Sequence, residues 1–141
     1  MRFPAEFRLS RAPSAQVVVR AERAAVFPED TSTAKHDETG HVAWQAMPVL
    51  CEFILSSRGR QLLTSSRVLE LGAGIGVPAL LAGRVCRELI ITDSNDAVVE
   101  RLRRNVELNV GEMNCSGDAV RVENVSWGAD LFPNNLAHSV D

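Results

Sequence analysis

The sequence predicts an α/β fold in which strands and helices alternate around a parallel β-sheet. Three observations lead to this prediction. An apolar segment, residues 68–71, runs directly into a glycine-rich turn at residues 72–76. A second apolar segment, residues 88–92, ends in Asp93, and a third strand-like segment follows at residues 119–125. With helical patterns between them, these segments give the order strand, helix, strand, helix, strand, which requires right-handed crossovers. We therefore expect half of a doubly wound, Rossmann-like sheet with flanking helices.

The composition indicates one folded domain. The 141 residues are 45% hydrophobic and 23% charged, which are ordinary values for a globular chain. The formal net charge of -3 produces no basic field, so nucleic acid is not an expected partner. No apolar run is long enough to span a membrane, and the arginine-containing N-terminus lacks the apolar core of a secretory signal.

The cysteines indicate a reducing environment. Cys51, Cys86 and Cys115 are far apart in the sequence, and their spacing is not typical of a metal site. Cys51 and Cys86 have apolar neighbours and are expected to be small buried side chains. We therefore predict no metal centre, and a location in the cytoplasm with the nucleus as an alternative.

Residues 1–40 are expected to form an N-terminal leader with one short strand. Residues 1–15 contain two prolines and little periodicity, whereas residues 16–21 are rich in valine and predict a strand. Residues 26–40 have the composition of a loop. The sequence therefore predicts a domain boundary after residue 40.

An amphipathic helix is predicted within residues 41–57. Apolar side chains recur there at helical spacing and are expected to face the core: Ala46, Val49, Leu50, Phe53 and Ile54. Pro48 suits the first turn of this helix, where a missing N–H costs nothing. Trp44 comes just before the helix and is expected to fix it to the domain. A short segment, residues 61–66, then leads into the strand before the glycine turn.

Two further helices are predicted between the strands of the sheet. Residues 78–85 are rich in Ala, Leu and Gly, which is typical of a helix packed closely on a sheet. Residues 94–96 supply N-caps for the next helix. The buried face of that helix is expected to carry apolar side chains at four-residue spacing: Val98, Leu102 and Val106, flanked by Val99 and Val110.

The carboxyl ends of the predicted strands bring together residues suited to a nucleotide-type cofactor. Glycines without a Cβ let the main chain approach a ligand closely. Asp93 ends the second strand, where a carboxylate can accept hydrogen bonds from both hydroxyls of a ribose. Trp127 could lie against an adenine, and Trp44 could close the site. Each of these residues alone has a structural explanation, as a helix cap or a packing residue, but their order and spacing favour a ligand. Six residues are predicted to bind the cofactor: Trp44, Gly72, Ala73, Gly74, Asp93 and Trp127.

The glycine spacing and one carboxylate decide between two cofactors. A dinucleotide fingerprint requires G-x-G-x-x-G, but Val77 stands where the third glycine would be. Glu70 places a carboxylate beside the turn, which is unfavourable for a pyrophosphate and acceptable for a ligand with a sulfonium and an amino group. The sequence therefore favours S-adenosylmethionine, and an NAD-dependent oxidoreductase remains an alternative.

The run VLELGAGIGVPALLA at residues 68–82, Thr92 with Asp93, and NVELN at residues 105–109 resemble the seven-β-strand methyltransferases. With residues 40–44 and 126–128, they resemble more narrowly the methyltransferase-like 21 group of protein-lysine methyltransferases, methyltransferase family 16. The resemblance covers roughly residues 40–130. It implies S-adenosylmethionine as cofactor, a lysine in a protein substrate as acceptor, and cofactor contacts for the six residues named above.

The chain departs from this family at its C-terminal end. Family members continue into a fourth strand with an Asp-x-x-Tyr-type element near the substrate lysine, and this chain stops at Asp141. Residues 41–141 are therefore expected to form a partial S-adenosylmethionine-binding methyltransferase domain of low stability and low activity. A truncated, non-catalytic binding module is a further alternative. His36, His41 and His138 lie in loop-like contexts and are expected to have surface or capping roles, so no catalytic residue is assigned.

Overall fold

The centre of the fold is a parallel sheet. The computed structural model describes residues 5–9, 17–22, 40, 44–115 and 117–128. In this part of the chain the sheet consists of β3 (Arg67–Glu70), β4 (Glu88–Asp93) and β5 (Val120–Asn124), with β4 in the middle. Leu69 lies opposite Ile90, and Ile90 lies opposite Arg121. The predicted order of strands and helices and the parallel pairing are confirmed.

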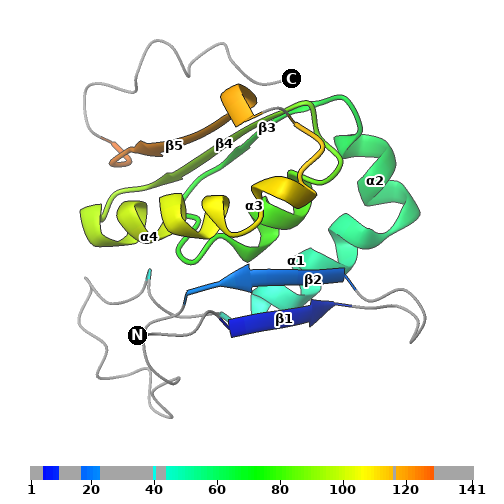
Figure 1. The fold of residues 1–141 in the computed structure, drawn as a ribbon, viewed down its shortest axis with the longest axis horizontal. Coiled ribbons are helices and arrows are strands. Elements are labelled where there is room, and N and C mark those ends of the chain that lie inside the picture. Colours follow the sequence, from blue (N-terminus) through cyan, green and yellow to red (C-terminus); the bar gives the residue numbers. More distant parts are fainter. Residues whose placement is uncertain (1–4, 10–16, 23–39, 41–43, 116, 129–141) are drawn as a thin grey trace.

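Two helices cover one face of this sheet, and a hairpin packs on the far side of the helices (Figure 1). The helices are α3 (Val77–Ala82) and α4 (Asp96–Glu107), and the hairpin pairs β1 (Ala5–Leu9) with β2 (Val17–Ala21) in antiparallel register. Helices α1 (Ala46–Leu55) and α2 (Ser57–Leu63) lie at one end of this arrangement, and α1 packs against α3. Two short 3-10 helices, η3 (Val110–Glu112) and η4 (Gly117–Ala119), precede β5.

Helix α4 follows its sequence signals closely. The side chain of Asn95 caps it by accepting hydrogen bonds from the N–H groups of Ala97 (2.9 Å) and Val98 (3.2 Å), as the N-cap prediction requires. Val98 and Leu102 are fully buried. The expectation for Val110 is wrong, because α4 ends at Glu107 and Val110 lies in η3 with 46% of its surface exposed.

The N-terminal region contains a strand that the sequence analysis missed. Residues 1–15 are expected to be loose, yet residues 5–9 form β1. Phe7 and Leu9 pack against a cluster of buried side chains from β2, α1 and α3. Their alternation with polar neighbours is the signal, and it is short because only five residues carry it. In β2, which was predicted, Val19 and Ala21 are completely buried in the same cluster. The hairpin therefore shares a core with α1 and α3.

The predicted core face of α1 is wrong. Val49, Leu50 and Phe53 are 69%, 44% and 43% exposed, and of the predicted face Ile54 alone is buried. The helix instead packs through a neighbouring face: Met47, Cys51, Ile54 and Leu55. Both faces have helical spacing, because nine of the ten residues in α1 are apolar or proline, so periodicity could not choose between them.

Helix α2 was also missed, because Gly59 suggests a break in the chain. Ser56 caps α2, and its Oγ accepts a hydrogen bond from the N–H of Gly59 at 3.0 Å. A Cβ on Gly59 would lie 2.0 Å from the carbonyl oxygen of Phe53, so this glycine allows α2 to pack tightly against α1. No helix in the described segments is both long enough and apolar enough to cross a membrane.

Candidate functional site

The glycine turn links β3 to α3 with three residues in the left-handed region. Gly72, Gly74 and Gly76 have φ values of 64°, 56° and 78°, which side chains with a Cβ rarely adopt. The N–H of Gly76 donates to the carbonyl oxygen of Ala73 at 2.9 Å and closes the turn. The tight turn predicted from the glycine spacing is confirmed.

The end of β4 holds this turn in place. The N–H of Ala73 donates to the carbonyl oxygen of Thr92 at 2.9 Å, and the N–H of Gly74 donates to Oδ2 of Asp93 at 3.0 Å. The other carboxylate oxygen of Asp93, Oδ1, accepts a hydrogen bond from the N–H of Asn95 at 3.1 Å. Asp93 is 8% exposed, and each of its oxygens keeps a further lone pair for another donor.

Trp127 and Gly40 approach the turn from two other segments. A Cβ on Gly72 would lie 2.8 Å from Cζ2 of Trp127, so the indole rests directly over the glycine main chain. The indole is 69% exposed. A Cβ on Gly74 would lie 3.2 Å from the carbonyl oxygen of Gly40, so the segment before α1 also reaches the turn. The absence of side chains at these glycines allows both close approaches.

The structure brings five of the six predicted site residues together at the carboxyl edge of the sheet: Gly72, Ala73, Gly74, Asp93 and Trp127. Trp44 lies just before α1 and is 51% exposed, and its carbonyl oxygen accepts a hydrogen bond from the N–H of Met47 at 3.0 Å. Its part in a ligand site stays a prediction.

Glu70, which the sequence predicts to be a negative charge beside the turn, is a buried carboxyl group with a raised pKa. Its side chain accepts a hydrogen bond from the N–H of Ala79 in the first turn of α3. The Oε2 atom is buried without a hydrogen-bond partner. Burial raises the pKa of Glu70 from 4.5 to about 7, although the bond from Ala79 lowers it in part. The neutral form of Glu70 is therefore favoured more than that of an exposed glutamate, and the side chain disfavours a pyrophosphate less than a fully ionised carboxylate would.

Cys51 and Cys86 are buried as predicted, and Cys115 is buried as well. All three are buried free thiols. Burial, and to a lesser extent the charge of Glu70, raises the pKa of Cys51 to about 12. Burial also raises the pKa of Cys86 to about 12. Thiols with such pKa values carry almost no thiolate at neutral pH, so they act as packing residues.

Sequence reasoning missed two polar residues that support the turn. The hydroxyl of Thr92 donates to the carbonyl oxygen of Glu70 at 2.9 Å, and Nδ2 of Asn105 donates to the carbonyl oxygen of Ile75 at 2.9 Å. Both side chains are fully buried. A polar residue on the apolar face of α4 was the available signal for Asn105, because buried polar groups require partners.

The described residues contain no group of His, Cys, Asp or Glu side chains that could hold a metal ion. His36, His41 and His138 lie outside the described residues, so their predicted surface and capping roles stay predictions.

A family model and several relatives that match this chain are described as lysine methyltransferases. Residues 29–141 match a family model described as lysine methyltransferase. The chain is 31% identical over 115 residues to the protein N-terminal and lysine N-methyltransferase EFM7 of Yarrowia lipolytica, a match that covers 70% of this chain and 41% of that protein. It is 37% identical over 94 residues to the protein N-lysine methyltransferase METTL21A of Danio rerio, covering 65% of this chain and 41% of that protein.

A third relative is the human protein-lysine N-methyltransferase EEF2KMT, which is 36% identical over 83 residues, covering 57% of this chain and 24% of that protein. The chain spans about two fifths or less of the length of these relatives. The match of the family model over most of the sequence shows that this chain belongs to the lysine methyltransferase family.

Proposed function

We propose that this protein is an S-adenosylmethionine-dependent methyltransferase that acts on lysine in a protein substrate. The observation that carries the proposal is the convergence of the glycine turn, Asp93 and Trp127 at the carboxyl edge of the sheet. In open α/β sheets, ligands bind at this edge. The relatives support the acceptor, because METTL21A and EEF2KMT are both named as lysine methyltransferases.

The residues at the site fit the methyl donor. The lone pairs left on Asp93 suit two ribose hydroxyls, and the exposed indole of Trp127 suits the face of an adenine. Charge-assisted hydrogen bonds of this type contribute about 1.5 to 3 kcal/mol each. The glycine turn would hold the methionine end, because its main chain is exposed at Gly72 beside the indole of Trp127. A cationic ligand near Glu70 would favour its ionised form and so lower its pKa.

When bound, the donor supplies a methyl group on a sulfonium, which a neutral amine can attack. The contribution of this chain is to bind and orient that group. Alignment of two reactants is worth about 7 to 11 kcal/mol of the barrier, so positioning alone supports a large rate effect. No catalytic residue is assigned to the chain.

A protein N-terminus is a second candidate acceptor. The EFM7 relative is named for both N-terminal and lysine methylation, and both acceptors are amines that must be neutral to react. We also propose a cytoplasmic location, which rests on the three free thiols.

Calorimetric titration with S-adenosylhomocysteine tests the donor site. We expect the unaltered chain to bind it, Asp93→Asn to bind at least about tenfold more weakly, and Asp118→Asn to bind normally. Asp118 is exposed and lies in η4, so it is a matched control for the loss of a carboxylate. Equal affinity in Asp93→Asn and the unaltered chain would refute the site. Binding of NAD in place of S-adenosylhomocysteine would refute the methyltransferase proposal.

A further inference from the structure

Two buried asparagines lie on the hairpin side of α4, one within the helix and one just after its end. Asn105 is fully buried and Asn109 is 3% exposed. Both side chains form hydrogen bonds to the hairpin segment that packs beside α4 (Figure 1), Asn105 at Glu22 and Asn109 at Arg20. Buried amides are hydrogen-bonded in folded proteins, so the partners of these two side chains show what they hold.

The side chain of Asn109 forms hydrogen bonds to β2 like those that the main chain of a neighbouring strand would form. Its Oδ1 accepts a hydrogen bond from the N–H of Arg20 at 3.1 Å, and its Nδ2 donates to the carbonyl oxygen of the same residue at 2.6 Å. Nδ2 also donates to the carbonyl oxygen of Asn105 at 2.7 Å. Asn109 therefore ties the hairpin to α4.

Asn105 joins the hairpin to the glycine turn. Its Oδ1 accepts a hydrogen bond from the N–H of Glu22, just after β2, at 2.7 Å. Its Nδ2 donates to the carbonyl oxygen of Ile75 at 2.9 Å, between Gly74 and Gly76. One amide group thus bridges two segments that are far apart in the sequence.

The bond to Ile75 fixes one peptide plane of the turn from both sides. The carbonyl of Ile75 and the N–H of Gly76 belong to the same planar peptide group. The carbonyl binds Asn105, and the N–H binds the carbonyl oxygen of Ala73 at 2.9 Å. Glycines on either side of Ile75 give this turn many alternative conformations. Loss of the Asn105 contact would therefore release the orientation of this peptide.

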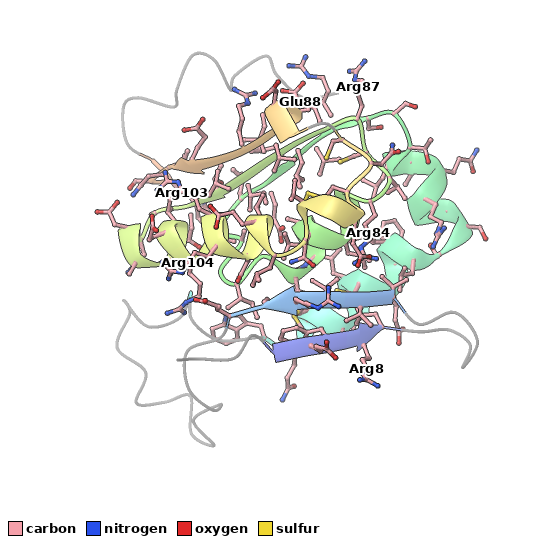
Figure 2. All side chains as sticks on the ribbon, viewed as in Figure 1. Arg8, Arg84, Arg87, Glu88, Arg103 and Arg104 are labelled. Carbon is pink, nitrogen blue, oxygen red and sulfur yellow. The ribbon has the colours of Figure 1, made fainter. Side chains whose placement is uncertain are left out.

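A salt bridge and a hydrogen bond to the main chain reinforce the position of the hairpin next to this contact. Arg104 Nε lies 3.1 Å from Glu22 Oε2, and the guanidinium of Arg84 donates to the carbonyl oxygen of Val18 in β2. Figure 2 labels Arg84 and Arg104, which lie beside α3 and α4. The hairpin is therefore held at both ends of β2, and Asn105 extends this support to the turn.

We propose that Asn105 is a positioning residue for the donor site, which couples the position of the hairpin on α4 to the conformation of the glycine turn. The proposal rests on the proposed function, since the turn must bind the methyl donor for the coupling to affect activity. A residue that only stabilises the fold would lower stability without a separate effect on the turn.

The matched pair Asn105→Ser and Asn109→Ser tests the proposal. Each variant loses a buried amide of the same size that binds the hairpin segment, from α4 at Asn105 and from just after α4 at Asn109. Amide hydrogen exchange by NMR at Gly74 and Gly76, measured without ligand, reports the turn directly. Titration with S-adenosylhomocysteine reports the site, and thermal unfolding reports stability.

Asn105→Ser should raise the exchange rate at Gly76 and weaken S-adenosylhomocysteine binding, each by about tenfold. Asn109→Ser should lower the unfolding temperature while both other quantities stay within about twofold of the unaltered chain. Unchanged turn exchange in Asn105→Ser would overturn the proposal, and so would effects in both variants that simply follow their loss of stability.

If either serine variant fails to fold, Asn105→Asp and Asn109→Asp decide at pH 8. Each retains the acceptor oxygen for the hairpin main chain and loses the N–H donor, so Asn105→Asp alone cuts the bond to Ile75. We again expect faster exchange at Gly76 and weaker binding in Asn105→Asp, and a loss of stability alone in Asn109→Asp. If the unaltered chain binds no S-adenosylhomocysteine, the proposed function fails, while the exchange rates still decide whether Asn105 holds the turn.

Discussion

The two ends of the parallel sheet hold their carboxylates in different ways. At the amino end, Glu88 lies between the neighbouring strands, with its oxygens 2.9 Å from Arg67 Nε and 2.9 Å from Arg121 Nη2. Figure 2 labels Glu88 at this end of β4. At the carboxyl end, Glu70 and Asp93 accept hydrogen bonds from main-chain amides.

This difference separates an ion-paired end from the end that we propose binds the methyl donor. The charge of Glu88 is compensated by two guanidinium groups, so a further cation gains little there. At the carboxyl end the carboxylates are held by main-chain amides, which carry no net charge, so a cationic ligand would supply the compensating charge there. The comparison predicts that Glu70→Gln and Glu88→Gln change the free energy of unfolding in opposite directions.

The largest effect is expected for Glu70→Gln. Because burial raises the pKa of Glu70 from 4.5 to about 7, the unfolded chain releases this proton at lower pH than the folded chain. Ionisation of Glu70 therefore costs the folded state up to about 3 kcal/mol above pH 7, and nothing below pH 4. Glu70→Gln should be more stable than the unaltered chain by up to that amount at pH 8 and equal to it at pH 4.

Urea unfolding at both pH values measures this difference. An equal change in the free energy of unfolding at pH 4 and pH 8 would show that Glu70 is not buried as an acid with a raised pKa.

Trp127→Ala should separate binding from stability. The indole is 69% exposed, so the free energy of unfolding should change by less than about 0.5 kcal/mol. Stacking of a base on an aromatic side chain contributes about 1 to 3 kcal/mol, so S-adenosylhomocysteine should bind about tenfold more weakly. Phe53→Ala, an exposed aromatic on α1, is the control and should bind normally. Trp44→Ala in the same titration decides whether the sixth predicted residue belongs to the site.

Gly74→Ala should destabilise the carboxyl end. Its φ of 56° and a Cβ only 3.2 Å from the carbonyl oxygen of Gly40 should together cost about 1 to 2 kcal/mol. Gly111→Ala is the control, because a Cβ there meets nothing within 4 Å. Thermal or urea unfolding measures both, and a loss of the same size in both variants would contradict the strained turn.

The smallest effect is expected at the amino end. Glu88→Gln removes the charge from two partly exposed ion pairs, which should cost less than about 1 kcal/mol. Raising the salt concentration should shrink this cost, because salt screens exposed charges. Destabilisation that is independent of salt would point to packing rather than charge.

Local signals predicted the parallel sheet and the residues that meet at its carboxyl edge. The glycine turn needs positive φ at particular positions, and Asp93 follows a buried strand, so both are visible in the sequence. The raised pKa of Glu70 could not be predicted from the sequence, because it arises from burial in the folded chain, where the side chain lies near Ala79 of α3 and Cys51 of α1. The bridge through Asn105 joins segments far apart in the chain, and no local pattern encodes such a contact.

Helix α1 shows where periodicity fails. Its sequence is apolar on nearly every side. Packing against α3 and the hairpin therefore decides which face of α1 is buried, and the sequence of the helix does not. β1 was missed for a different reason: five alternating residues are a weak signal.

The exposed apolar face of α1 has a consequence for the chain in solution. Val49, Leu50 and Phe53 form an apolar strip open to water among the described residues. Contact between two such strips releases ordered water, so collisions between copies of the chain become attractive. In colloidal terms, light scattering should give a negative second virial coefficient near neutral pH, and Val49→Glu should move it toward positive values.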